Sequence, residues 1–199
     1  METQKNRRKN IYALCQSAIF IALATILSFL PVYEMPMGGS VTMASMLPIL
    51  FIGFKFGPKW GMGSAFVYTL IQLSQALIEG NVFIYCVGAG AVIICVLFDY
   101  LVPFSILGLS FIAAPKKGEK INMVKVLVTF GIIIFVRFLC HLITGMVIWK
   151  QWAPEGMGAF IYSLSYNGSY MLPELILTLV VTAFLLSSRQ IEKLLEKEN

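Results

Sequence analysis

The sequence predicts an all-α integral membrane protein with six transmembrane helices and both termini in the cytoplasm. Of its 199 residues, 58% are hydrophobic and 13% are charged, whereas soluble domains use roughly 45–50% apolar and 25% charged residues. The mean hydropathy is +0.82. Apolar residues gather in runs that approach the about 20 residues a spanning helix needs. Lys and Arg gather in every second connection between these runs.

Charges and turn residues divide the chain, which we treat as one domain over residues 1–199, into six spans. The predicted spans are approximately residues 11–30, 41–54, 60–78, 85–114, 123–149 and 159–186. A basic segment at 1–10 precedes them, and a charged amphipathic tail at 189–199 follows. The uncharged run at 10–33 is too long for the apolar part of a signal peptide and lacks a small-residue cleavage site, so we expect it to remain as a span.

Turn residues mark the ends of the spans in order. The first span ends before Pro31, and the loop after it contains the pair Gly38 and Gly39. The second is short, the turn KFGPK separates it from the third, and the third stops at EGN. The fourth ends at the loop PKKGEK, and the loop KQWAPEGMG separates the fifth from the sixth.

Positive charge sets the predicted orientation. Thirteen of the fifteen Lys and Arg residues lie in the terminal segments and in alternate loops, while Lys150 is alone on the other side and Arg137 lies within a span. Short cytoplasmic loops hold the positive charge, so both termini are predicted to be cytoplasmic. The net charge of +5 therefore indicates contact with lipid and no nucleic-acid partner. The outer loops carry Glu34, Glu79 and Glu155, which favour a cationic ligand.

Signatures of enzymes and metal sites are missing from the sequence. We find no Walker A loop, HExxH, GxSxG or nucleotide fingerprint. The one His and the scattered Cys residues do not have the spacing of a zinc site. We therefore predict no metal, no cofactor and no catalytic residues. No internal repeat of the transporter kind is visible, so a protein of this size is poorly equipped to transport alone.

Polar residues within the fourth and fifth spans are candidates for a site. An Asp in the middle of a membrane helix costs about 2.5–3.5 kcal/mol on insertion scales unless it faces a cavity or a cation. Asp99 therefore either contacts a ligand or forms a structural ion pair with Arg137, and the two readings can coexist. Arg137, His141 and Gly145 follow one helical stripe that Trp149 continues to the outer end.

The sixth span adds Tyr162, Tyr166 and Asn167 near its outer end, with Glu174 seven residues beyond Asn167 on the same face. Aromatic residues at the ends of spans ordinarily form an interfacial belt, which accounts for Trp152 but not for the polar groups. Polar side chains from three helices, with aromatic faces at the outer end, predict a pocket that opens to the outside and holds a flat, hydrogen-bonding molecule.

Two small residues in the first span raise a separate question. Ala18 and Ala22 form a small-xxx-small pair of the type that lets helices approach closely in membranes. Their spacing alone favours packing within the chain over contact with a partner protein.

Six sequence blocks, distributed over nearly the whole chain, carry a family resemblance. They are GGSVTMASMLPIL, KWG, LFDYLVPFSILGLS, HLITGMVIW, APEGM and YSLSYNGSYMLPE. With these blocks the sequence resembles the ThiT family, the thiamine-binding subunits of energy-coupling factor transporters. The ordered spacing from His141 through Trp149 and Tyr162 to Asn167 is the most specific part of the resemblance.

The resemblance implies a six-helix vitamin-capture protein of the bacterial plasma membrane, without enzymatic activity, that binds thiamine from the outside. It implies association with a transmembrane coupling subunit and two cytoplasmic ATPases. Contact with the coupling subunit would fall on Ala18 and Ala22, which reverses the preference drawn from spacing alone. The implied ligand-binding residues are Asp99, Tyr100, His141, Trp149, Tyr162 and Asn167, with Tyr85 as a further position.

Three departures from the family pattern affect the site. Asp99 stands where the family has Glu, which is longer by one methylene. A Trp common in the first loop is absent, so Tyr33, Met35 or Met37 is expected to cover the ligand instead. The segment EGNVFIYCVGAGA is longer than its counterparts, which makes Tyr85 the weakest assignment.

Three alternatives to a thiamine-binding subunit stay open at this point. The ligand could be another flat molecule, such as a hydroxymethylpyrimidine or a different vitamin. The chain could be a small membrane enzyme that uses His141 as a base and Asp99 as an acid. It could also be a scaffold protein whose buried polar groups are structural.

Overall fold

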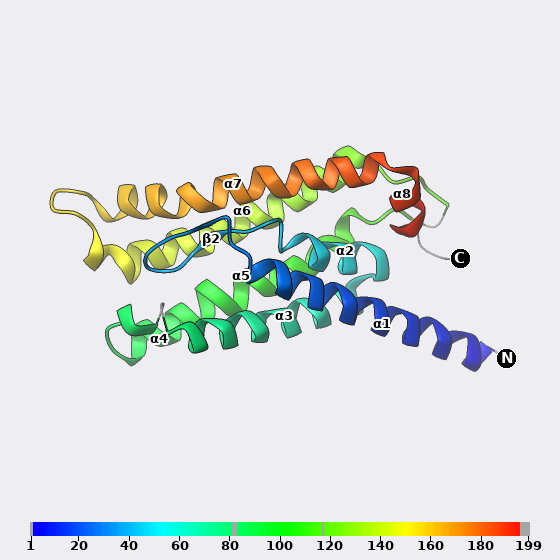
Figure 1. Ribbon diagram of the computed structural model, residues 1–199, viewed down its shortest axis with the longest axis horizontal. Helices are drawn as coiled ribbons and strands as arrows, with labels where there is room; N and C mark the ends of the chain where they lie inside the picture. Colours follow the sequence, from blue (N-terminus) through cyan, green and yellow to red (C-terminus); the bar gives the residue numbers. More distant parts are fainter. Residues whose placement is uncertain (1, 81–82, 117, 196–199) are drawn as a thin grey trace.

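The chain folds into helices that run along one long axis, as the computed structural model shows (Figure 1). The structure describes residues 2–80, 83–116 and 118–195. Its elements in order are α1 (Glu2–Ser28), β1 (Tyr33–Glu34), β2 (Ser40–Val41), α2 (Leu47–Phe56), α3 (Pro58–Glu79), η1 (Phe83–Tyr85), α4 (Ala89–Cys95), η2 (Val96–Leu101), α5 (Val102–Ser105), η3 (Ile106–Ala113), α6 (Met123–Val147), η4 (Trp149–Trp152), α7 (Ala159–Ser187) and α8 (Arg189–Leu195). The predicted all-α class is confirmed.

Within the described part of the chain, four helical stretches are long and apolar enough to cross a membrane. They are Gln4–Ser28, Ala89–Ala113, Met123–Val147 and Ala159–Ser187. These correspond to the predicted first, fourth, fifth and sixth spans. The predicted third span is α3, which has 22 residues but also carries polar side chains such as Gln72 and Gln75. The number of six membrane crossings therefore stays a prediction.

The second predicted span is wrong in its first part. Helix α2 begins only at Leu47, whereas the span was expected from residue 41. The residues before it form a short antiparallel hairpin in which Tyr33 pairs with Val41 and Glu34 pairs with Ser40. The turn contains Gly38 and Gly39, both with φ near +90°, a backbone conformation that glycine adopts readily. We call residues 33–46, which comprise this hairpin and the chain up to α2, the hairpin segment.

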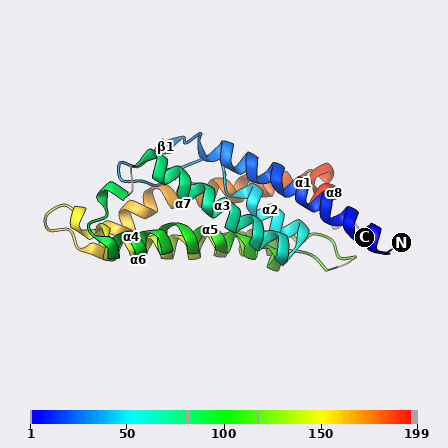
Figure 2. The same cartoon turned by 90° about the horizontal axis from the view of Figure 1, so that it is seen from below.

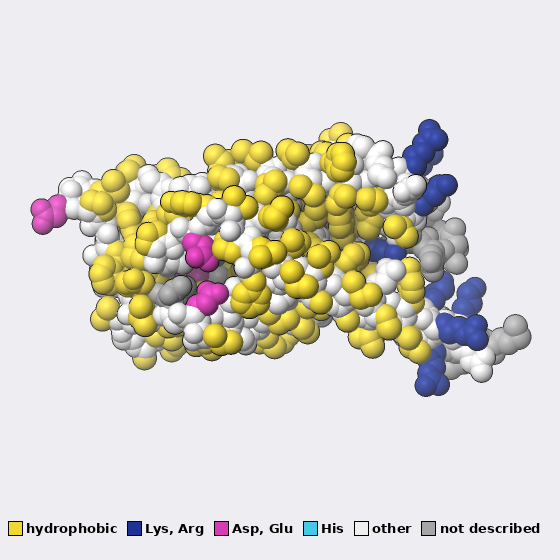
Figure 3. All heavy atoms as spheres, viewed as in Figure 1, with side chains coloured by type: hydrophobic (Ala, Val, Ile, Leu, Met, Phe, Trp, Pro, Cys, Tyr) yellow, Lys and Arg dark blue, Asp and Glu magenta, His cyan; other side chains and the backbone are white. Residues whose placement is uncertain are grey.

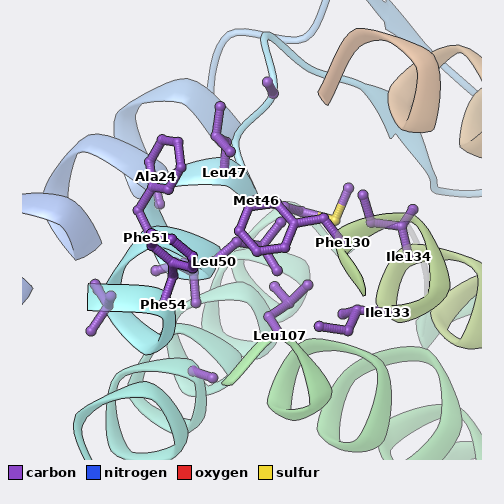
Figure 4. Packing of buried hydrophobic residues seen from close by; sticks show 14 of the residues in the cluster. Ala24, Met46, Leu47, Leu50, Phe51, Phe54, Leu107, Phe130, Ile133 and Ile134 are labelled. Carbon is purple, nitrogen blue, oxygen red and sulfur yellow. The ribbon is translucent and has the colours of Figure 1, made fainter. Parts of the chain in front are cut away.

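A tightly packed apolar core fills the half of the molecule around α2. It joins α2 with α3, η3 and α6. Figure 4 shows side chains of α2, η3 and α6 converging in this core. Phe130 is fully buried, and its ring centroid lies 6.1 Å from that of Phe51 and 6.4 Å from that of Phe54. Such aromatic contacts, together with the buried apolar area, account for much of the stability of this half.

Three glycines let α2, α3 and η3 cross in close contact. A Cβ on Gly61 would lie 2.6 Å from the Cα of Gly53 and 2.7 Å from the carbonyl oxygen of Gly108. A Cβ on Gly108 would in turn lie 2.8 Å from the backbone of Gly61. Only glycine fits at this crossing, which we call the glycine crossing.

The surface of the helices is apolar along most of the long axis (Figure 3). Large hydrophobic side chains on α6 and α7 point outward, including Ile132, Val180 and Phe184, whose exposed fraction is 76%. In water, exposed apolar surface of this extent would be unfavourable, whereas lipid accommodates it. The chain is a membrane protein. On the face in Figure 3, the Lys and Arg side chains gather at one end. Figures 1 and 2 show that α1 begins and α8 lies at this end.

Candidate ligand-binding site

A pocket lies between the hairpin segment, α3, the fourth helical stretch, α6 and α7. Its cavity volume is about 180 Å³, far more than the about 10–15 Å³ needed to hold a single water. The predicted site residues that line it are Asp99, Tyr100, His141, Trp149, Tyr162 and Asn167. The structure thus brings six of the seven predicted ligand-binding residues together, from η2, α6, η4 and α7.

Asp99 accepts three hydrogen bonds from neighbouring side chains. Its Oδ1 lies 2.9 Å from Nδ1 of His141 and accepts a hydrogen bond from the Thr144 hydroxyl. Its Oδ2 lies 3.3 Å from the indole Nε1 of Trp149, which donates to it. A carboxylate has about four acceptor positions, and three of them are occupied. The remaining position is on Oδ2, the oxygen with a single donor.

The neighbours of His141 fix its tautomer. Nε of Arg137 lies 3.4 Å from Nε2 of His141. A guanidinium group can only donate, so Nε2 accepts and carries no proton. Nδ1 therefore carries the proton and donates it to Asp99. The ring of His141 also makes an edge contact with Tyr170, with 6.4 Å between the centroids.

The alternative of a direct ion pair between Asp99 and Arg137 is wrong. The partner of Asp99 is instead His141, whose neutral ring donates a hydrogen bond from Nδ1 to the carboxylate. Arg137 instead stacks over Phe104, with its guanidinium carbon 4.1 Å from the ring centroid, and donates to the sulfur of Met46. His141 stands between the two charged side chains, because its two ring nitrogens bridge them.

Asn167 lines the pocket but is also engaged with the protein. Its Nδ2 donates to the carbonyl oxygens of His141, at 3.1 Å, and Ser163, at 3.0 Å. Its Oδ1 accepts from the Tyr170 hydroxyl at 2.8 Å. A Cβ on Gly145 would collide with Ser163 and lie 3.0 Å from Nδ2 of Asn167. Asn167 therefore joins α7 to α6 where the two helices are in close contact. Because its Nδ2 and Oδ1 are already hydrogen-bonded to the protein, little hydrogen-bonding capacity remains for a ligand.

Two aromatic side chains complete the walls. Tyr100 stacks between Phe83 and Phe104, with centroid distances of 6.0 Å and 6.3 Å. The hydroxyl of Tyr162 is buried and has no hydrogen-bond partner among the described residues. A buried hydroxyl without a partner costs free energy, so this group is available to a bound molecule.

Tyr85 is the predicted position that the structure does not bring to the pocket. It ends η1, and its ring packs edge-on against Trp152, with 5.4 Å between the centroids. Its carbonyl oxygen accepts a hydrogen bond from Gln151. These contacts direct Tyr85 toward η4 and away from the residues that line the cavity.

The hairpin segment forms one side of the pocket. Met35 and Met37 line the cavity, as does Glu34, whereas Tyr33 does not. Glu79 lines it from the end of α3. Of the three first-loop residues expected to cover the ligand, Met35 and Met37 therefore remain as candidates.

Helix α7 holds the hairpin segment at several points. Glu174 accepts hydrogen bonds from both the amide and the hydroxyl of Thr42, each at 2.7 Å. The Tyr166 hydroxyl accepts from the amide of Met37 and donates to the carbonyl of Gly38. Sequence reasoning placed Glu174 on the face of Asn167 but missed Thr42, since a threonine in an apolar stretch carries no signal of its own.

Ala18 and Ala22 lie exposed on α1, on a different face from the buried Ala13 and Ala24. Packing against the chain's own helices, which the spacing alone favoured, is therefore wrong for this pair. Within residues 2–80, 83–116 and 118–195, no group of three His, Cys, Asp or Glu side chains is arranged to hold a metal.

A helical membrane protein with a pocket lined by a carboxylate, hydrogen-bond donors and aromatic rings is of the class that binds small molecules in the membrane. Residues 14–194 match the family described as thiamine transporter protein (Thia_YuaJ). The chain belongs to this family, which confirms the resemblance seen in the sequence. The family is one of transport proteins, so the alternative of a membrane enzyme is excluded.

Relatives extend over nearly the full length of the chain. It is 32% identical to the thiamine transporter ThiT of Bacillus subtilis (strain 168), over 90% of this chain and 93% of that protein. It is 27% identical to ThiT of Lacticaseibacillus paracasei, over 91% and 90%. A solved structure of ThiT from Listeria monocytogenes has the same fold, with a TM-score of 0.70 and 22% identity over 92% of this chain and 98% of that one.

Proposed function

We propose that this chain is the thiamine-binding subunit of an energy-coupling factor transporter in the bacterial plasma membrane. It captures thiamine from outside, and partner subunits drive uptake with ATP. The observation that carries the proposal is the open acceptor position of Asp99 in a pocket that Trp149 and Tyr162 also line, in a member of the thiamine transporter family.

The chemistry of thiamine matches these groups. Its aminopyrimidine has an amino group that can donate to Oδ2 of Asp99, and ring nitrogens that can accept from the unpaired Tyr162 hydroxyl. Its thiazolium carries a permanent positive charge, which the ring of Trp149 and the negative charge of Asp99 favour. Glu34 and Glu79 beside the cavity raise the local concentration of a cation.

In this proposal six helices cross the membrane, with both termini cytoplasmic. The Lys and Arg side chains then lie at the cytoplasmic end. Helix α2 has 10 residues and spans only about 15 Å, so the hairpin segment completes the second crossing. Irregular backbone is tolerated at membrane depth where it is buried in protein or lines a cavity, and the hairpin segment does both.

The exposed face of α1 that carries Ala18 and Ala22 contacts the transmembrane coupling subunit, and two ATPases bind on the cytoplasmic side. Small residues favour close approach of a partner helix. Ala18→Leu or Ala22→Leu should leave thiamine binding by the isolated protein unchanged while abolishing ATP-driven uptake in membranes that contain the partners. Loss of binding together with uptake would place these alanines within the chain's own packing.

Titration of the purified protein with thiamine tests the ligand. Trp149 contacts the pocket, so binding should quench intrinsic fluorescence at sub-micromolar thiamine. The Trp149→Phe variant retains Trp60 and Trp152 and should lose most of the signal. A flat titration, checked by calorimetry, would reject thiamine. Competition with the pyrimidine and thiazole halves then decides whether both parts of the vitamin are recognised.

A further inference from the structure

The fourth helical stretch changes its winding where it reaches the pocket. An α-helical turn, α4, is followed by a π-helical segment, η2, then by the short α5 and the 3₁₀ segment η3. Within it the amide of Val102 donates to the carbonyl of Leu97, five residues earlier. Asp99 and Tyr100 both lie in the π segment. Single π turns are rare and occur frequently at functional sites.

Pro103 opposes an ordinary α-helix at this place. In an α-helix each amide donates to the carbonyl four residues earlier, and for residue 103 that carbonyl belongs to Asp99. Proline has no amide hydrogen, and its ring clashes with that carbonyl. The α-helical alternative is therefore destabilised at the residue that carries the pocket's carboxylate.

A second helix proline shows that proline alone does not produce the wide turn. Pro173 lies inside α7, which remains α-helical through it. The fourth stretch differs because it is held on both sides of Pro103. Asp99 is bound by His141 and Thr144 of α6, and Gly108 is held against Gly61 in the glycine crossing.

The attachments of Asp99 and Gly108 fix the orientation of the helix about its axis at residues 99 and 108. Changing the register between them by one residue would turn Asp99 by about 100° around the helix axis relative to Gly108. Either the carboxylate would leave the pocket or the glycine crossing would open. The π turn, followed by the tightly wound η3, satisfies both attachments.

We propose that Pro103 is a positioning residue for ligand recognition: it favours the π turn that presents Asp99 and Tyr100 together to the pocket. The use of thiamine as the ligand in the binding tests below rests on the proposed function. Pro103 is buried and is not among the residues that line the cavity, so it acts through Asp99 and not by contact.

The test compares Pro103→Ala with Pro173→Ala. Pro103→Ala should weaken thiamine binding by at least ~10-fold, the loss expected when one charged hydrogen bond is misplaced. Pro173→Ala, the matched control, should bind thiamine within ~2-fold of the wild type, inside the variation of surface changes. Unchanged affinity in Pro103→Ala would overturn the proposal.

A double-substitution cycle separates positioning from general damage. If Pro103 acts through Asp99, the variant that combines Pro103→Ala with Asp99→Asn should bind thiamine no more than ~2-fold more weakly than Asp99→Asn alone. Additive losses would mean that Pro103 supports the pocket by another route, and would overturn the assignment.

A measurement without ligand distinguishes failure of this inference from failure of the proposed function. The indole N–H of Trp149 donates to Asp99, and its ¹⁵N-¹H resonance, assigned with Trp149→Phe, reports that contact. In the thiamine-free protein, Pro103→Ala should move this resonance toward its position in Asp99→Asn. An unmoved resonance overturns the inference, whether or not the wild type binds thiamine. A wild type that does not bind thiamine rejects only the proposed function.

Discussion

The interior of the molecule is apolar in one half and polar in the other. Around α2 the interior is apolar, with Phe130 packed against Phe51 and Phe54. Around the pocket the buried groups are polar, and most are paired across elements, as Asp99 with α6 and Glu174 with the hairpin segment. The first half stabilises the fold through packing, while the second places paired donors and acceptors around the cavity. Substitutions in the two halves should therefore have separable effects on stability and on binding.

The largest effect on stability is expected from Phe130→Ala. Its ring is fully buried, and truncating such a ring costs about 3–5 kcal/mol in the free energy of unfolding. Denaturation in detergent, followed by circular dichroism, measures this loss. The folded fraction should bind thiamine within about 3-fold of the wild type, since Phe130 does not line the cavity. A large loss of affinity at full folding would contradict the separation of the two halves.

Asp99→Asn should have the opposite effect: a large loss of affinity for thiamine and a small loss of stability. Removing the charge should cost about 1.5–3 kcal/mol of binding free energy, the range for hydrogen bonds to charged groups, with a smaller effect on the melting temperature. Calorimetry with thiamine and with a neutral deaza analogue isolates the charge, because the analogue should lose less affinity. Equal losses for the two ligands would show that the charge of Asp99 does not act on the cation.

Gly61→Ala tests the glycine crossing. The added Cβ meets backbone atoms of Gly53 and Gly108, and overpacking of this kind costs about 1–3 kcal/mol of stability. Gly63 on the same helix has no atom within 4 Å of its Cβ position. Gly63→Ala is therefore the control and should be neutral or slightly stabilising. If the two variants melt at the same temperature, the crossing is looser than described.

Thr42→Val should have the smallest effect. It removes one of the two hydrogen bonds to Glu174 and retains the backbone bond, at a cost of about 1 kcal/mol. Thr42→Ser keeps the hydroxyl and is the control. Hydrogen exchange of residues 33–46 should accelerate in Thr42→Val only. Equal exchange in both variants would show that the backbone bond alone holds the hairpin segment.

Polar residues within apolar spans were the part of the site that could be predicted from the sequence. Asp99, His141 and Asn167 stand out because ionisable and amide groups are costly in hydrocarbon, and the structure brings them to one pocket. Helix α7 follows its prediction closely for the same reason, since its apolar run is long and bounded by glycine.

Features that depend on tertiary contacts were not predictable. Thr144 binds Asp99, yet a threonine in an apolar helix is unremarkable by itself. The expected helix at residues 41–46 is replaced by extended chain because Thr42 is bound by Glu174, which lies 132 residues away. The π turn depends on two attachments to different helices, and the sequence contains only one of its causes, Pro103.

The apolar core has a consequence for the exit of a captured molecule. It lies between the cavity and the end of the chain that carries the Lys and Arg side chains, and the glycine crossing leaves no room there for even a methyl group. The close packing at the glycine crossing therefore leaves no passage for a bound molecule between α2, α3 and η3.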